Sequence, residues 1–404
     1  MIDRGQNYSV TEVGGVGSER EIAERSSAPA ARSDRMEGRV EIGGAANTSV
    51  VVGHTNPSVE KMERSSVAAR PTAPAMGTSQ NSEMSRHLAE VERLIRRALS
   101  SRYESVDELC TYASSMGGKR LRPRLTILCA EALGHVPEAR LPDVYRAASA
   151  VELVHAASLV HDDVMDDADI RRHKPTIGRL AGSSAAILLG DYLFTKAYAL
   201  AAMCRSRQVA VRIADAATAL CEGELRQQLM SRVWETSVRD YRSVLQQKTG
   251  ALCAVSCYLG ARTVVTNRQQ LGFAKQLYHF GMRLGLAFQI YDDWLDYWGT
   301  DQVGKTLATD LKQQKPTLPL LRLLETSTPP VREELVSLLT GETEHEAKLS
   351  RVLEFLGNSD ASEYTLRVAK TQATRAMECL EPLADSPSVK ALKQLAEFSV
   401  QRRT

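Results

Sequence analysis

The sequence predicts an all-α fold, with roughly ten or more helices around a deep central cavity. Between about residues 83 and 403, apolar residues recur every three or four positions, which is the period of a helix with one buried face. Gly and Pro lie mostly at the joints between these stretches, and aromatic residues make up only 5% of the chain. The segments 143–167, 183–203 and 208–229 therefore favour long helices over strands.

Composition is that of an ordinary globular protein. Of the 404 residues, 43% are hydrophobic and 25% are charged. The formal charge of +2, from 51 Lys and Arg against 49 Asp and Glu, provides no bulk attraction to nucleic acid or to an anionic membrane. No apolar run approaches the ~20 residues of a membrane-spanning helix, and no export signal precedes the helical region. We therefore expect a soluble, cytoplasmic protein without a transmembrane segment, which binds anions only through local clusters of cations.

The first 80 residues differ from the rest. They are rich in Ser, Gly, Ala, Arg and Glu, contain few large apolar residues and show no sustained period. We interpret 1–80 as a disordered tail ahead of a single domain at 83–404. Acidic residues such as Asp3 and Glu12 argue against a transit peptide. The short run 49–52 could form a strand or contact a partner, although a solvated linker is the simpler interpretation.

Seven cysteines are scattered through apolar helical stretches, with no CxxC pair that would indicate zinc or redox chemistry. Cys253 and Cys257 stand one helical turn apart, but their neighbours are apolar, so packing explains them better than a metal does. The cysteines are therefore predicted to be core thiols in a reducing compartment.

One short motif occurs twice. Residues 162–166 are Asp-Asp-Val-Met-Asp and residues 292–296 are Asp-Asp-Trp-Leu-Asp, so both have the form DDxxD. Each copy follows a largely apolar helical stretch, at 150–160 and at 284–291. An isolated copy would be explained equally well by a solvated helix face. Two copies that both lead out of core-like helices indicate a site.

The spacing of the motif places its carboxylates on one helix face. At about 100° per residue, Asp162 and Asp166 fall one turn apart, and His155 and Ser158 extend the same stripe. The equivalent stripe in the second copy carries Gln289, Asp293 and Asp296.

Carboxylates one turn apart repel each other, so a cation must compensate them. Mg²⁺ prefers such hard oxygen ligands, keeps several waters and usually joins one or two carboxylates to a phosphate. Two facing helices of this kind would hold Mg²⁺ ions around one diphosphate. The alternative, in which His161 and Asp162 form the metal pair of a phosphohydrolase, lacks the additional histidines that such a site requires.

Two basic groups could bind diphosphates beside these carboxylates. Residues 117–124 are GGKRLRPR, with four cations within six residues after a glycine pair whose amides could approach an anion. Residues 171–176 are RRHKPT and lie just beyond the first acidic motif, and guanidinium groups are well shaped for bidentate phosphate contact. Acidic and basic groups alternate here, as a metal–phosphate site requires.

These residues resemble the trans-isoprenyl diphosphate synthase family, also called polyprenyl synthetases, over about 83–403, and most of all its long-chain members. The matching blocks stand in the family's usual order. They are GGKRLRPRL at 117–125, LVHDDVMDDADIRRHKPT at 159–176, GDYLF at 190–194, QQKTGAL at 246–252, FQIYDDWLDYWG at 288–299 and GKTLATDLKQQKPTLPLL at 304–321.

The resemblance implies a role for each matching residue. Those that would hold Mg²⁺ against the allylic diphosphate are Asp162, Asp163, Asp166, Asp292, Asp293 and Asp296, assisted by Arg171, Lys248 and Lys305. Those that would bind the diphosphate of isopentenyl diphosphate are Lys119, Arg122, His155 and Arg172. Thr249 and Gln289 would lie beside the developing allylic cation, where their oxygen dipoles stabilise positive charge.

The sequence departs from the family pattern at four positions. His173, Ala308 and Gln314 stand where glycine is common, and Gly250 stands where alanine is common. None of these changes removes a predicted metal ligand or phosphate contact. They are expected to affect closure of loops over the substrate rather than activity itself.

The resemblance also implies an all-α bundle, normally a homodimer, that uses Mg²⁺. Its partners would be isopentenyl diphosphate and an allylic diphosphate, which is geranyl, farnesyl or geranylgeranyl diphosphate. A long lipid product would favour loose peripheral association with a membrane.

Product length should depend on the cavity wall one to two turns before Asp162. The residues there are Val154, Ala157 and Ser158, none of them aromatic, and Ala157 lies about 7.5 Å along the helix from Asp162. Without a bulky side chain to stop growth, we expect a long all-trans chain of roughly C30 to C50, as in quinone side chains.

Three alternatives differ in what they would require. A short-chain synthase would stop at C15 or C20 as a farnesyl or geranylgeranyl diphosphate synthase. A noncatalytic subunit of a heteromeric synthase would commonly lack an aspartate motif, and both are intact. A terpene cyclase would have a different second metal motif and more aromatic residues in its cavity.

Overall fold

The protein is described by a computed structural model, which describes residues 78–116, 118–231, 233–299, 308–341 and 345–401. Nearly all of its regular structure is helical, so the predicted all-α class with ten or more helices is confirmed. The predicted tail lies outside the described residues except for 78–80, which begin the first helix, α1 Thr78–Leu99.

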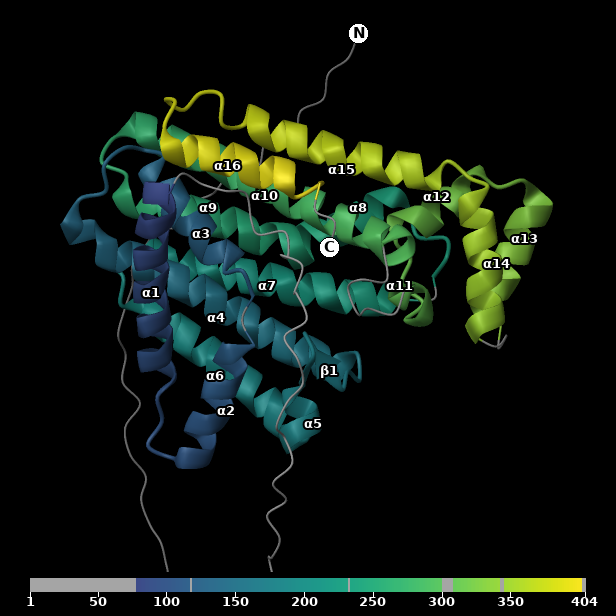
Figure 1. Ribbon diagram of the computed structural model, residues 1–404, viewed down its shortest axis with the longest axis horizontal. Coiled ribbons are helices and arrows are strands. Elements are labelled where there is room, and N and C mark those ends of the chain that lie inside the picture. The colour runs from purple at the N-terminus through teal and green to yellow at the C-terminus, as the bar shows by residue number, and fades with distance from the viewer. Residues whose placement is uncertain (1–77, 117, 232, 300–307, 342–344, 402–404) are drawn as a thin grey trace, which may run out of the picture. The chain divides into compact units, whose positions relative to one another are not determined.

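Six helices build the centre of the bundle (Figure 1). The helix α4 lies against α6, and α9 is packed between α3 and α10. These helices are α3 Leu121–Glu131, α4 Leu141–Met165, α6 Ser183–Ala202, α7 Arg207–Met230, α9 Ala251–Val264 and α10 Arg268–Trp298.

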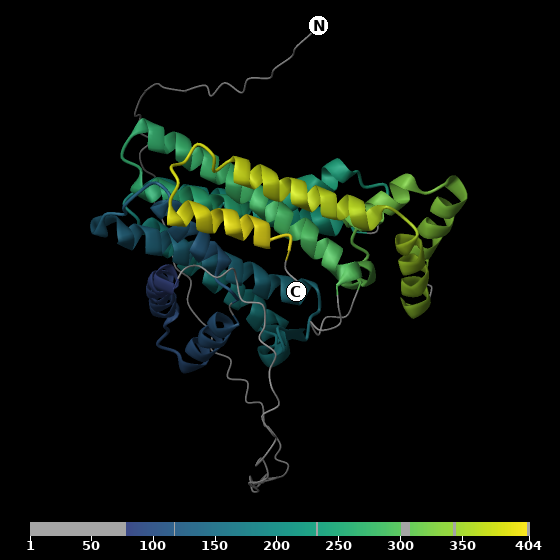
Figure 2. The same ribbon diagram turned by 45° about the horizontal axis from the view of Figure 1, so that its top comes forward.

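The last two helices cover one side of this centre (Figure 2). In chain order they are α15 Ala361–Glu378, which packs along α10, and α16 Pro387–Phe398, which packs on α3. The helices α12 Leu318–Thr326, α13 Pro329–Thr340 and α14 His345–Gly357 form an adjoining group with a small apolar core of its own.

Short elements connect the long helices. A two-stranded antiparallel ladder pairs Ile170 with Pro175 and Arg171 with Lys174. The remaining elements are α2 Glu104–Ser115, η1 Glu138–Arg140, β1 Ile170–Arg171, β2 Lys174–Pro175, α5 Ile177–Ala181, α8 Val238–Leu245, η2 Gln246–Gly250 and α11 Thr309–Lys312.

Several helices begin where the local sequence supplies a cap. The Asn267 side chain accepts the backbone N–H of Gln270 at 2.9 Å and so starts α10. Ser237 does the same for Asp240 at the start of α8, at 3.1 Å. Pro142 stands in the first turn of α4, where a missing N–H costs no helical hydrogen bond.

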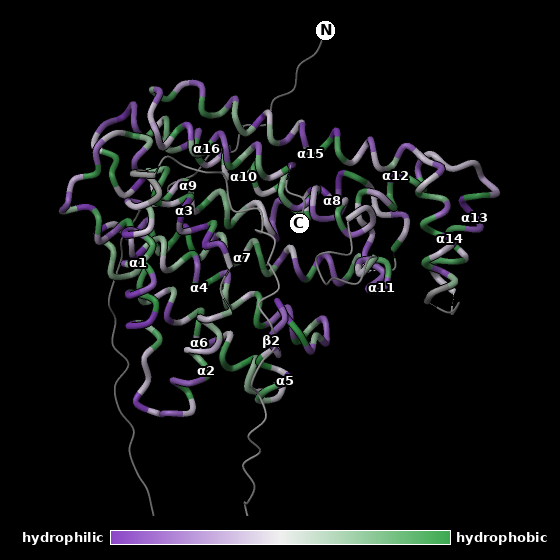
Figure 3. The backbone as a smooth tube through the Cα atoms, in the orientation of Figure 1, coloured by the Kyte–Doolittle hydropathy of each residue, from purple (hydrophilic) through white to green (hydrophobic). Residues whose placement is uncertain are grey.

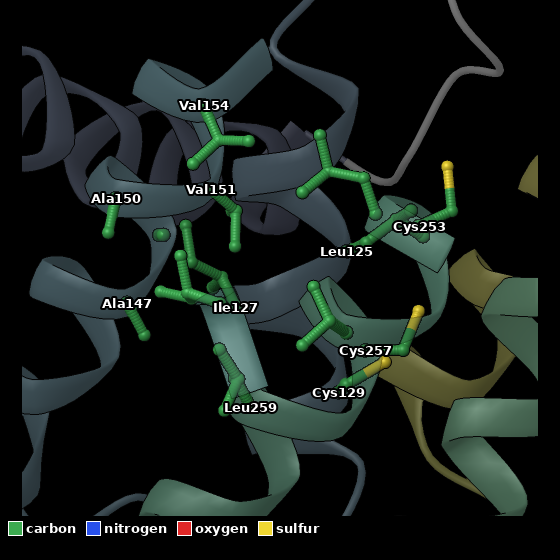
Figure 4. Packing of buried hydrophobic residues seen from close by; sticks show 14 of the residues in the cluster. Leu125, Ile127, Cys129, Ala147, Ala150, Val151, Val154, Cys253, Cys257 and Leu259 are labelled. Carbon is green, nitrogen blue, oxygen red and sulfur yellow. The ribbon is translucent and has the colours of Figure 1, made fainter. Parts of the chain in front are cut away.

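Small residues allow the central helices to approach closely (Figure 4). A Cβ on Gly260 of α9 would lie 1.9 Å from the backbone oxygen of Thr126 on α3, so any larger residue would push these helices apart. Cys129, Cys253 and Cys257 are buried in this core, as the sequence predicted, but Cys221 is exposed and Cys379 half-buried, so the prediction was wrong for these two thiols. Along the central helices, apolar residues recur between polar ones (Figure 3), which is the predicted helical period.

The helix α6 is the one among the described residues that is long and apolar enough to span a membrane. Buried helices of soluble proteins meet the same criterion, and α6 packs along α4 with Ala186 and Leu193 fully buried. A single such helix is therefore weak evidence of a membrane span. Its other side exposes Ile187 and Leu188.

Candidate active site

The first aspartate motif lies at the C-terminal end of α4. Asp163 is only 6% exposed and accepts a hydrogen bond from Arg171 Nε at 2.6 Å. Asp166 lies 3.3 Å from Lys315 Nζ. Burial raises the pKa of Asp162 to about 6, although the nearby cation Lys248 opposes that shift. Each carboxylate of this motif therefore has a cation close to it.

The second motif lies in the last three turns of α10, and its carboxylates have other partners. Asp293 is 5% exposed and accepts bonds at both oxygens, from Tyr241 Oη at 2.5 Å and from Gln289 Nε2 at 3.1 Å. Burial raises the pKa of Asp293 to about 6, even though these two hydrogen bonds act to lower it.

Asp296 holds the segment that follows the second motif. Its carboxylate oxygens accept the backbone N–H groups of Thr309, at 3.1 Å, and Asp310, at 2.9 Å. Its backbone oxygen accepts the N–H of Ala308 at 2.7 Å. Because these amides begin α11, Asp296 fixes the start of that helix.

The two motifs face the same space because α11 connects them. Asp296 holds the start of α11, and Lys315, which follows this helix, reaches Asp166 of the first motif. The pair joins residues 149 positions apart in the sequence. These contacts link the two motifs through α11 and Lys315.

A break in regular helix places Lys248 and Thr249 at this site. Residues Gln246–Gly250 form one turn of π-helix between α8 and α9, a feature common at functional sites. Lys248 forms an ion pair with Glu224 and donates to Gln227 Oε1 at 2.7 Å. Burial alone would lower the pKa of Lys248, but Glu224, Asp162 and Asp166 outweigh it and raise the pKa, so the ammonium stays charged.

The two basic groups meet on the other side of α4. Arg172 Nη1 donates to the backbone oxygen of Met116 at 2.7 Å, and a Cβ on Gly118 would lie 2.7 Å from the Arg172 guanidinium. A larger residue at position 118 would displace the end of the Arg172 side chain. Arg122 Nε is buried and, among the described residues, has no hydrogen-bond partner. Lys119 is exposed, with Nζ 5.5 Å above the Phe398 ring.

Arg120 tethers the first basic group instead of pointing into it. Its guanidinium donates to Glu152 Oε1 at 2.9 Å and to the backbone oxygen of Ser114 at 3.1 Å, and it is also paired with Glu92. Arg120 is left-handed, with φ +51°, an unusual conformation for a residue with a Cβ. The neighbouring Lys119 and Arg122 are thereby held at a fixed place.

His155 lies between the motif and the basic groups. Burial, reinforced by nearby positive charges, lowers the pKa of His155 well below its ordinary value, so the ring is neutral. The charged neighbours responsible are Arg122, Arg172, Arg171 and Arg120. Neutral imidazole among arginines can share a phosphate oxygen without adding a competing charge.

The donor set fits Mg²⁺ that is shared with a substrate. Among the residues whose placement is described, no three potential ligands already gather closely enough to hold an ion alone. Mg²⁺ usually takes one or two carboxylates and completes its shell with water and phosphate oxygens. The carboxylates of Asp162 and Asp166 on the rim of α4 suit that arrangement.

The remaining predicted residues are placed as follows. Val154 and Ala157 have no exposed surface, and Ser158 donates to the backbone oxygen of His155 at 3.0 Å. Asp292 stands beside Asp293, whose pKa it raises. Lys305 lies outside the described residues.

The sequence analysis missed several residues that the fold brings to the site, namely Glu224, Gln227, Tyr241, Asp310 and Lys315. Asp310 is buried near Asp293 and Asp296, and burial with these charges raises the pKa of Asp310 well above its ordinary value. Asp310 and Lys315 lie inside a block that was singled out, 304–321, so acidic and basic residues in that block were a usable signal. Tyr241 and Glu224 had no local signal.

This fold and site define a class of protein, an all-helical enzyme that handles diphosphates with carboxylates, arginines and a lysine. A model of the polyprenyl synthetase family matches residues 103–356. The chain belongs to the polyprenyl synthetase family and is a prenyltransferase, as its motifs predicted.

Relatives and solved structures agree with this assignment. Octaprenyl diphosphate synthase of Escherichia coli (strain K12) is 33% identical over 319 residues, which cover 78% of this chain and 95% of that protein. A decaprenyl diphosphate synthase from Rhodobacter capsulatus superposes with a TM-score of 0.75 at 28% identity, covering 81% of this chain and 99% of that one. A polyprenyl synthase from Caulobacter crescentus CB15, complexed with calcium and isoprenyl diphosphate, superposes with a TM-score of 0.74 at 31% identity. The match covers 82% of this chain and 99% of that one.

Proposed function

We propose that this protein is a Mg²⁺-dependent long-chain all-trans polyprenyl diphosphate synthase. It joins isopentenyl diphosphate to an allylic diphosphate and repeats the step to products of roughly C30 to C50. The observation that carries the proposal is the contact between Lys315 and Asp166, which supports a shared site because Lys315 follows the helix α11 that Asp296 of the second motif holds.

The two substrates have separate sets of ligands. The allylic diphosphate takes the Mg²⁺ side, where Asp162, Asp166 and Lys248 lie. Arg122, Arg172 and Lys119 bind the diphosphate of isopentenyl diphosphate. The buried, unpartnered Nε of Arg122 supports this second assignment, because a buried donor without a partner is costly unless a ligand satisfies it.

The metal site combines residues from both motifs. Bound Mg²⁺ would neutralise charge on the leaving diphosphate, and Asp162, Asp166, Asp292 and Asp296 would hold it. Asp163 and Asp293 belong to the predicted set as well, but unlike the half-buried Asp296 both are buried, and their oxygens accept side-chain bonds from Arg171, Tyr241 and Gln289. We assign them chiefly to orienting those partners.

The reaction follows from this arrangement. The C–O bond of the allylic diphosphate breaks, and the diphosphate leaves with the electron pair while Lys248 and Arg171 stabilise its charge. The double bond of isopentenyl diphosphate attacks the resulting cation and forms the new C–C bond. A proton is then lost to the departed diphosphate, since the neighbouring Thr249 and Gln289 are not bases.

Product length is assigned to the wall formed by α4. Val154, Ala157 and Ser158 are small or medium-sized, so they leave room for a growing tail. The names of similar proteins, an octaprenyl and a decaprenyl diphosphate synthase, support a long product.

We further propose a homodimer that uses the exposed apolar side of α5 and α6. Leu180, Ile187 and Leu188 are exposed there, and Leu188 is 68% exposed. Exposed apolar residues grouped on neighbouring elements are typical of protein interfaces. Covering this side would also account for the apolar composition of α6.

The test is to incubate the full-length protein with Mg²⁺, labelled isopentenyl diphosphate and farnesyl diphosphate, and to separate the dephosphorylated products by reverse-phase chromatography. We expect a ladder that ends between C30 and C50. A stop at C20, one unit beyond the C15 primer, would overturn the assignment of chain length alone. Absence of any incorporation would contradict the proposed synthase and favour a subunit that needs a partner.

A further inference from the structure

A chain of three hydrogen bonds runs from a buried tyrosine to the predicted reacting centre. Tyr241 Oη donates to Asp293 at 2.5 Å, Gln289 Nε2 donates to the other oxygen of Asp293 at 3.1 Å, and Thr249 Oγ1 donates to Gln289 Oε1 at 3.1 Å. The chain links α8, α10 and the π-helical turn.

The direction of each bond is determined by chemistry. An ionised carboxylate only accepts hydrogen bonds, so the Gln289 group that faces Asp293 has to be the NH₂. The carbonyl oxygen of Gln289 is then turned toward Thr249, whose hydroxyl hydrogen points at it. The lone pairs of Thr249 and the amide oxygen are therefore presented together at one place.

Oriented oxygen dipoles of this kind stabilise positive charge only if they are held in place before the charge develops. If the amide of Gln289 rotated by half a turn, its NH₂ would face Thr249 and the dipole would have the wrong sign. Asp293 prevents this rotation as long as its carboxylate faces Gln289. Tyr241, which is buried, donates to the second oxygen of Asp293 and so holds the carboxylate in this orientation.

We propose that Tyr241 is a positioning residue, whose hydroxyl orients Asp293 and thereby fixes the amide of Gln289 with its oxygen toward Thr249. This inference rests on the proposed function, because the dipoles matter only if an allylic cation forms beside them. It assigns a purpose to Tyr241, which stands outside both aspartate motifs, and to Asp293, whose two oxygens face inward.

The first variant is Tyr241→Phe, which removes one oxygen and keeps the ring. We expect kcat to fall roughly tenfold while KM for both substrates and the Mg²⁺ requirement stay within about twofold, because the ligands of both diphosphates are untouched. Tyr145→Phe is the matched control. It also loses a hydroxyl that makes a hydrogen bond, to His87 at 2.8 Å, but at the interface of α1 with α4, and its kcat should equal that of the wild type.

A second variant separates positioning from general stability. Gln289→Leu removes the amide with little change in volume, and we expect it to lower kcat more than Tyr241→Phe does. In the double variant Tyr241→Phe with Gln289→Leu, loss of the hydroxyl should have no additional effect, because its target is gone. A merely structural tyrosine would lower kcat by the same factor in both backgrounds.

The outcomes are distinguishable. Three results would overturn the positioning role while the wild type remains an active synthase. They are a wild-type kcat in Tyr241→Phe, a wild-type kcat in Gln289→Leu, and an equal effect of Tyr241→Phe on kcat with and without Gln289→Leu. If Tyr241→Phe does not fold, the kcat and KM of Gln289→Leu remain as the test, and an unchanged kcat in that variant would overturn the positioning role. A wild-type protein that incorporates no isopentenyl diphosphate would instead overturn the proposed function and this inference with it.

Discussion

The two aspartate motifs have the same spacing but different surroundings. On α4, Asp163 and Asp166 have cationic partners, Arg171 and Lys315. On α10, Asp293 accepts bonds from a tyrosine and an amide, and Asp296 from backbone N–H groups. The difference indicates that the first motif is balanced by cations, whereas the second motif orients Gln289 and fixes the start of α11.

The largest expected effect tests the charge of the first motif. Asp162→Asn should lower kcat on the order of 10³-fold, because a neutral amide is a poor Mg²⁺ ligand and leaves the diphosphate charge uncompensated. Steady-state kinetics over a range of Mg²⁺ concentrations would measure it. Asp215→Asn, which changes an exposed carboxylate paired with Arg212, is the control and should keep wild-type kcat. Equal activity of the two variants would remove Asp162 from the site.

The same variant should not destabilise the metal-free protein. Burial raises the pKa of Asp162 to about 6 from 3.8, so the folded state binds this proton more tightly than the unfolded state does. The stability that this carboxyl contributes is full below pH 3.8 and is lost as the pH rises through about 6. At pH 7.5, Asp162→Asn should therefore be more stable than the wild type by about 1 kcal/mol in chemical unfolding.

Removal of Asp296 from the second motif should destabilise the protein, whereas Asp162→Asn in the first motif should stabilise it. Asp296→Ala takes away the acceptor for two backbone N–H groups of α11, so we expect a loss of about 1–2 kcal/mol in unfolding free energy together with roughly 10²-fold lower kcat. Asp296→Asn keeps one acceptor oxygen for the two N–H groups, so it should recover part of the stability but little of the activity. If Asp296→Ala unfolds like the wild type, the two motifs do not differ in the way described.

A third change concerns the helix that leads into the first motif. Ala157→Phe or Ser158→Phe should shorten the main product to C15 or C20, because a bulky ring would block the wall about one turn before Asp162. The rate of the first condensation on farnesyl or geranyl diphosphate should stay within about threefold, since the metal side is unchanged. Product chromatography measures both, and an unchanged product distribution in both variants would rule out this wall as the determinant of length.

The smallest effect concerns the segment held by Asp296. His173, Ala308 and Gln314, where the sequence pattern led us to expect glycine, are all left-handed, with φ of +64°, +55° and +52°. Ala308→Gly should remove backbone strain of about 1–2 kcal/mol, because glycine adopts positive φ without a Cβ clash. Glycine also raises the entropy of the unfolded chain, which offsets part of this gain, so we expect a net stabilisation of roughly 0.5–1 kcal/mol. Ala369→Gly, a buried alanine within α15, should destabilise instead. Chemical unfolding would compare the two, and a loss of stability in both would contradict the strain argument.

Much of this protein could be predicted from short stretches of sequence. Helical period, caps such as Asn267, the repeated DDxxD motif and the two basic groups are local patterns, because the residues that define each of them lie within a few turns of one another. The sequence analysis noted His173, Ala308 and Gln314 only as departures from glycine, and the structure shows that all three have positive φ.

The sequence by itself therefore determined the all-α class and the position of both motifs on their helices, and it predicted the ion and anion that they suit. Only the tertiary structure decided which partner each carboxylate has. Tyr241 meets Asp293 across 52 residues and Lys315 meets Asp166 across 149, and nothing in either local pattern encodes those pairs. The physical reason is that a periodic pattern specifies which face of a helix is buried, whereas the packing of several helices specifies what that face touches.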